Sequence, residues 1–145
     1  MGSNPGSASQ GDLSEQLKLM RDVDPVASTG ATHTGAGIDR QTFGAGLFQI
    51  AVGVATGSPT AQTVIATLQD SADNSTFANA TAVTGLTVLG ASITTDSKVQ
   101  ELGGDLSSLR RYIRLSIVTT LTAGTSPTLP VSSVCALSGA DLYPA

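Results

Sequence analysis

The chain has no tryptophan, a single cysteine and a single histidine, and it carries little charge. Aromatic residues make up 3% of its 145 residues and charged residues 12%, which is about half the charged share of an ordinary soluble domain. A lone cysteine cannot form a disulfide within the chain. One histidine and one cysteine are too few for a zinc cage. These shortages exclude an internal disulfide framework and a His/Cys zinc site.

The scarcity of reactive side chains also argues against catalysis. A nucleophilic pair of Cys135 and His33 would need a thiolate in a polar setting, yet Cys135 lies in an apolar segment. We interpret Cys135 as a small residue of the core. We therefore predict a protein that is not an enzyme and needs no cofactor or metal.

Basic residues are few as well, and the net charge is −4 with a sequence pI near 4.6. Nucleic acid binding relies on Lys and Arg that neutralise phosphates, and anionic membranes attract the same residues. No apolar run approaches the ~20 residues that cross a bilayer, and we expect no secretory signal. Neither nucleic acid nor a membrane is an expected partner.

The abundant residues favour an all-β fold. Ser and Thr together number 36, and 16 Gly and 6 Pro supply turn residues. The clearest strand lies within 105–120, where apolar and polar residues alternate with the period of a pleated strand. The alternating residues are Tyr112, Ile113, Arg114, Leu115, Ser116 and Ile117. Such a strand needs a second sheet to cover its apolar side.

Similar patterns predict further strands, separated by Gly, Pro, Asn and Asp. Their ranges are 29–38, 43–54, 63–70, 83–89, 97–102 and 130–137. This spacing favours an antiparallel β-sandwich or jelly roll over residues 31–145. Asp39 and Asp105 each precede a long strand, and we expect both to turn the chain by accepting hydrogen bonds from nearby amides. The Asp-rich segment 70–75 is interpreted as a hairpin turn rather than a calcium loop, because it lacks EF-hand spacing.

Residues 1–30 are predicted to form a flexible N-terminal arm, with a possible short helix over 12–21. Asp12 has the spacing of a helix cap, and Leu13, Leu17 and Met20 would fall on one stripe. This stripe is either part of a frayed tail or a surface that docks on a neighbour.

Three of the seven basic residues lie close together at Arg110, Arg111 and Arg114. In a strand, Arg110, Tyr112 and Arg114 would share one face. That face is either solvated or a contact surface, since Arg and Tyr are enriched at protein interfaces. Arg110, Tyr112 and Arg114 are our candidate interface residues, together with Leu13, Leu17 and Met20.

Several segments follow one another in an order that resembles a known family. They are GID at 37–39, LFQIAVG at 47–53, LQDSADNSTF at 68–77, DLSSLRRYIRL at 105–115 and ALSGAD at 136–141. The order resembles that of jelly-roll head decoration (cement) proteins of tailed phages. The resemblance implies a structural virion protein on the capsid exterior, assembled in the host cytoplasm. Its implied partners are the major capsid protein and copies of itself, commonly in a homotrimer.

Two other functions remain open at this point. One is a different phage structural β-domain, such as a tail or fibre component. The other is a carbohydrate-binding β-sandwich module, although such modules usually stack sugars on exposed aromatic residues, and only two Tyr and three Phe are present.

Overall fold

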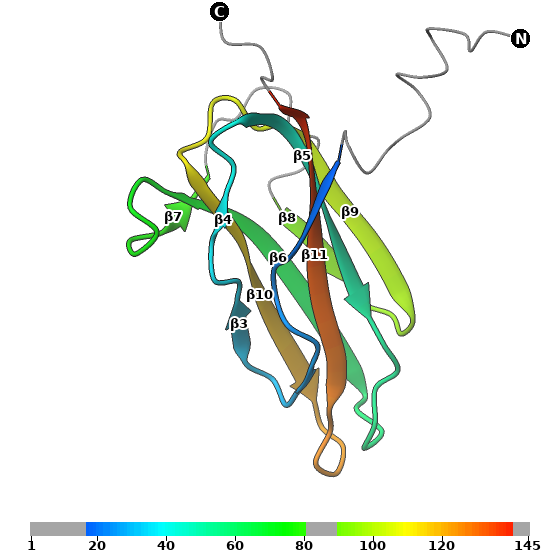
Figure 1. Ribbon diagram of the computed structural model, residues 1–145. Coiled ribbons are helices and arrows are strands. Elements are labelled where there is room, and N and C mark those ends of the chain that lie inside the picture. The colour runs from blue at the N-terminus through cyan, green and yellow to red at the C-terminus, as the bar shows by residue number, and fades with distance from the viewer. Residues whose placement is uncertain (1–16, 81–89, 141–145) are drawn as a thin grey trace, which may run out of the picture.

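The computed structural model describes residues 17–80 and 90–140, which form strands, turns and connecting segments without a helix. Its strands build two antiparallel sheets that pack face to face (Figure 1). In chain order they are β1 (Lys18–Arg21), β2 (Val26–Ser28), β3 (Thr32–Thr34), β4 (Ile38–Asp39), β5 (Phe43–Val52), β6 (Ala61–Ser71), β7 (Ala78–Asn79), β8 (Gly90–Ile93), β9 (Lys98–Asp105), β10 (Tyr112–Thr122) and β11 (Leu129–Ala140). The prediction of an all-β sandwich is confirmed.

The two sheets share one plan, in which long central strands are flanked by short strands that follow each other along an edge. Sheet A has the order β1-β11-β5-β9, and β2 continues the edge of β1 along β11. Sheet B has the order β3-β10-β6-β7, with β4 also on β10 and β8 also on β6. The N-terminal strands therefore run along sheet A and then cross to sheet B on the same side of the sandwich (Figure 1).

The core between the sheets is aliphatic, as the composition predicts. The inward residues of β10 are Ile113, Leu115 and Ile117, and all three are fully buried. Phe48 is the one aromatic residue of the described core. Cys135 lies beside it in the register of β11 with β5 and is also fully buried, which confirms its interpretation as a core residue.

The helix expected over 12–21 is wrong where the structure describes that range. Residues Lys18–Arg21 form β1, and their backbone pairs with β11, with Met20 opposite Cys135. A two-turn helix is marginal in water, whereas β11 offers a sheet edge with which a strand can pair. Residues 12–16, including Leu13, and the strand expected over 83–89 lie outside the described residues.

The boundary expected at residue 31 is also corrected, because β1 and β2 belong to sheet A. Of the expected contact stripe, Leu17 is exposed, and Met20 is half-buried and packs against the core. No helix in the described part of the chain is long and apolar enough to cross a membrane.

The turns confirm the roles expected for two aspartates. Asp39 accepts a hydrogen bond from the amide of Gln41 at 3.0 Å, and Asp105 accepts one from the amide of Ser107 at 2.9 Å. In the turn after β6, Asp73 accepts hydrogen bonds from the amides of the two residues before Phe77. No group of three or more His, Cys, Asp and Glu within 17–80 and 90–140 is arranged to hold a metal ion.

Candidate functional site

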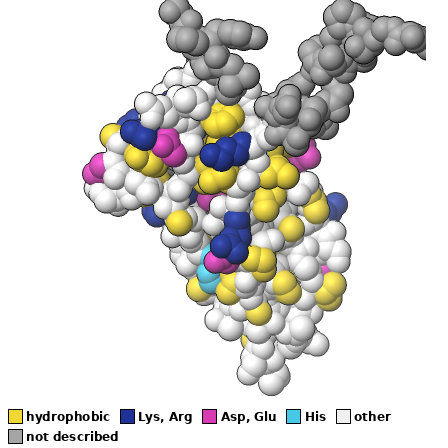
Figure 2. Space-filling model, viewed as in Figure 1, with side chains coloured by type: hydrophobic (Ala, Val, Ile, Leu, Met, Phe, Trp, Pro, Cys, Tyr) yellow, Lys and Arg dark blue, Asp and Glu magenta, His cyan; other side chains and the backbone are white. Residues whose placement is uncertain are grey.

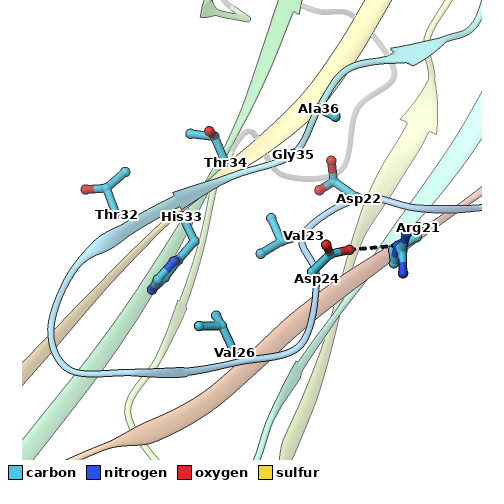
Figure 3. Close-up of a pocket in the computed structure, with 10 residues that line it drawn as sticks. All are labelled: Arg21, Asp22, Val23, Asp24, Val26, Thr32, His33, Thr34, Gly35 and Ala36. Carbon is cyan, nitrogen blue, oxygen red and sulfur yellow. Dashed lines mark ion pairs between the residues drawn. The ribbon is translucent and has the colours of Figure 1, made fainter.

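A hollow of about 700 Å³ lies at the edge of the sandwich where the chain crosses from sheet A to sheet B. Its walls are residues 21–24 and 26, from the end of β1 to the start of β2, and residues 32–36, within and after β3. Figure 3 shows Val23, Val26 and His33 pointing into this space. Arg21 and Asp24 form an exposed ion pair at its rim, with 2.7 Å between Nε and Oδ1.

Asp22 lines this hollow, and its side chain forms hydrogen bonds with both sheets. Its Oδ2 accepts a hydrogen bond of 2.7 Å from the hydroxyl of Ser133 in sheet A and one of 3.1 Å from the amide of Leu115 in sheet B. Burial raises the pKa of the Asp22 carboxyl to about 6, although these hydrogen bonds and the charge of Arg114 act in the opposite direction. A carboxyl in this position holds the edge strands across both sheets.

Glycine is required opposite this carboxyl. A Cβ added to Gly35 would lie 1.8 Å from Oδ1 of Asp22. Gly35 is buried, and its amide donates to the carbonyl of Leu115 at 3.1 Å. The space beside Gly35, between β3 and β4 in the chain, is therefore filled by the Asp22 carboxyl.

His33 has a structural partner in this part of the chain. Its Nε2 lies 2.9 Å from the hydroxyl of Ser28, which in turn contacts the hydroxyl of Thr119. Thr119 also donates to the carbonyl of Ala31 at 3.1 Å. Ser28 is 1% exposed, so this chain of hydroxyls stitches the crossover to β10 and does not present a nucleophile.

The Cys135 thiol is equally unsuited to chemistry. Desolvation by burial raises its pKa to about 12, and the nearby charge of Asp22 adds to the effect. The thiol is therefore protonated at neutral pH, when a nucleophilic cysteine would be a thiolate.

The basic cluster lies at the other end of β10, and its members have partners within the chain. Arg110 precedes β10 and turns toward Asp70, placing Nη2 2.8 Å from Oδ1. The Arg110 amide also donates to Oδ2 of Asp70 at 3.0 Å. Burial acts to raise the pKa of the Asp70 carboxyl, but the hydrogen bonds and charge of Arg110 outweigh it and lower the pKa below its usual value.

Only two of the three residues expected on one strand face are in β10. Tyr112 and Arg114 are half-buried on its outer side. The guanidinium of Arg114 lies 3.9 Å from the centre of the Phe77 ring, and its Nε donates to the side chain of Gln69 at 2.9 Å. The grouping of Arg110 with these two residues is corrected, because Arg110 lies before the strand and pairs with Asp70.

The outer face of sheet A is the feature that sequence reasoning missed. Leu19, Leu47, Val99 and Val134 all belong to this sheet and are all exposed. Figure 2 shows hydrophobic side chains spread over the surface around β1 and β11, with a few charged side chains among them. The sequence feature that indicates this face is the segment Phe43–Val52. Its apolar residues occupy both odd-numbered and even-numbered positions, so they lie on both faces of the strand.

No family model matches the chain, and no curated protein matches its sequence. The fold, its surfaces and the order of the segments are therefore the basis on which we infer a function.

Proposed function

We propose that the chain is a structural virion protein that binds the exterior of a tailed-phage head and stabilises the capsid lattice. Its partners in this proposal are the major capsid protein and further copies of itself. It works by adhesion, as a clamp between neighbouring capsid subunits, and no chemical step is involved.

The strand order is the observation that carries the proposal. If β1 with β2, β3 with β4, and β7 with β8 count as single interrupted strands, sheet A contains the first, eighth, third and sixth strands. Sheet B then contains the second, seventh, fourth and fifth. This is the arrangement of a jelly roll, a fold that recurs in viral capsid proteins. It is also the fold implied by the order of segments between residues 35 and 142.

The internal pairing of charges supports the same role. Arg110 and Arg111 are held by Asp70 and Asp39, with nearest N–O distances of 2.8 Å in both pairs. A clamp benefits from loops that are already ordered before binding, because less conformational entropy is lost on association.

The proposal is tested by imaging. Phage particles made with and without this protein are compared by electron cryomicroscopy, and we expect the additional density on the outside of the head. Density on the tail or fibres would favour the alternative of a tail component. No difference between the particles would overturn the proposal.

Occupancy on heads also tests the expected contact residues. Arg114→Ala removes a positive charge from the outer side of β10, and we expect it to lower occupancy. Lys98→Ala removes a positive charge from the exposed start of β9 and serves as the matched control. Equal occupancy for both variants and the wild type would exclude Arg114 from the contact.

A further inference from the structure

The exposed apolar residues of sheet A lie on one surface because of the strand register. One row crosses the sheet from Leu19 through Ala136 and Leu47 to Gly103. Leu19 is 74% exposed and Leu47 38%. Burying these apolar side chains against a partner would be favourable in free energy, and the monomer leaves them in water.

The neighbouring row carries charges of opposite sign at its two ends. It runs from Arg21 in β1 through Val134 and Gln49 to Glu101 in β9. Val134 is 42% exposed, so the row has an apolar member between its charged ends. The outer face of sheet A thus contains both a charge and its complement at the same height along the strands.

The outer side of sheet B also carries an exposed apolar pair, with Val118 of β10 (40% exposed) opposite Ile65 of β6 (47% exposed), but no row of its described residues has charges of opposite sign at its two ends. There Ser116 of β10 lies between Thr67 of β6 and Thr34 of β3. Hydroxyl groups of this kind are well solvated and gain little from a partner. The row with opposite charges at its two ends therefore distinguishes the outer face of sheet A from that of sheet B.

We propose that the outer face of sheet A is the surface through which copies of this chain associate, around an axis roughly parallel to its strands. Rotation about such an axis keeps the height of each row. It therefore brings Arg21 of one copy to Glu101 of the next, and the apolar rows face one another. The charge complementarity within the row favours a second copy over any other partner. This inference rests on the proposed function only for the number of copies, because the family resemblance implies a trimer.

The monomer's own ion pair does not prevent this exchange of partners. Arg21 and Asp24 are 72% and 71% exposed in their side chains. An exposed pair of this kind contributes little to stability, so Arg21 can turn to Glu101 of another copy at small cost.

The first test compares Val134→Glu with Ile65→Glu in the full chain, by light scattering and sedimentation equilibrium. Ile65 is 47% exposed on central strand β6 of sheet B, so it matches Val134 in exposure and placement. We expect the wild type to be an oligomer, Ile65→Glu to keep its mass, and Val134→Glu to fall to the monomer mass of 14.5 kDa. A monomeric wild type, or equal masses for the two variants, would overturn the proposal.

The second test exchanges the charges of the row. Arg21→Glu and Glu101→Arg should each weaken association, by about tenfold if two or three pairs are lost together. The double variant should regain most of the wild-type affinity, which a merely structural role of either residue would not produce. A double variant no tighter than the single variants would exclude the Arg21–Glu101 contact and with it the proposed axis. A monomeric protein that still decorates heads would overturn this inference and leave the proposed function standing.

Discussion

Two aspartates of this chain have nearly the same exposure and opposite proton affinities. Asp22 is 6% exposed and Asp70 is 8% exposed. The pKa of Asp22 is raised to about 6, whereas the pKa of Asp70 is lowered from 3.8. Two causes separate them: Asp22 lies deeper among surrounding atoms, so desolvation raises its pKa further, and Asp70 accepts from a guanidinium, whereas Asp22 accepts from an amide and a hydroxyl.

The comparison shows that a low exposed fraction alone does not decide the pKa of a carboxyl. Desolvation raises the pKa of both residues, and at Asp70 the hydrogen bonds and charge of Arg110 overcome it. Asp22 therefore holds the edge strands, although its burial makes the carboxylate form unfavourable at neutral pH. Asp70 holds the segment before β10 and is most stable as a carboxylate.

The largest expected effect comes from filling the space beside Asp22. In Gly35→Ala the new Cβ would displace the carboxyl, since it would lie 1.8 Å from Oδ1. Two effects together should lower the free energy of unfolding by about 4 kcal/mol: overpacking at Gly35, and loss of the Asp22 acceptor by the buried amide of Leu115. Urea denaturation measures this loss. Gly44→Ala is the control, because the nearest atom to its added Cβ is 3.8 Å away, and an equal loss there would contradict the role of Asp22.

The next effect is a pH dependence with opposite signs at the two sites. A raised pKa means that the stability contributed by Asp22 is present below pH 3.8 and is lost as the pH rises through about 6. A rise of the Asp22 pKa from 3.8 to about 6 corresponds to about 3 kcal/mol of stability lost between pH 4 and pH 7. Asp70, whose pKa is lowered, contributes stability above its unfolded pKa and loses it as the pH falls through its folded value.

Urea denaturation of the wild type and of Asp22→Asn at a series of pH values separates these contributions. The variant should lose the decline in stability between pH 4 and pH 7, because its side chain does not titrate. Parallel curves for the two proteins would show that Asp22 titrates normally.

The smallest expected effect concerns the two arginine pairs. Arg110→Met leaves the buried Asp70 without its guanidinium and should cost about 2 kcal/mol. Arg111→Met breaks a pair whose side chains are 47% and 43% exposed, and should cost less than about 1 kcal/mol. Thermal or urea denaturation compares them, and equal losses would mean that burial of Asp70 adds nothing to its pairing.

The central strands were predictable because their alternation is a local property. The segments 111–117 and 130–137 correspond to β10 and β11, and their inward residues, such as Leu115 and Cys135, are buried as expected. The turns at Asp39 and Asp105 were predictable for the same reason, since each aspartate bonds an amide two residues away.

The edge strands and the site were not predictable in this way. Residues 18–21 are too few for a period to distinguish a strand from a helix, and their pairing with β11 decided the outcome. The direction of Arg110 depends on Asp70, and the position of Asp22 depends on Leu115 and Ser133. These partners are 40 or more positions apart in the chain.

The amino-acid pattern by itself determined that this is a two-sheet β protein with an aliphatic interior, because alternation in a pleated strand assigns each side chain to one face or the other. Only the tertiary structure decided which strands became neighbours, and so which charged groups met and which apolar face of sheet A stayed in water. Local periodicity carries no information about pairing between distant segments, and the partners of each side chain follow from that pairing.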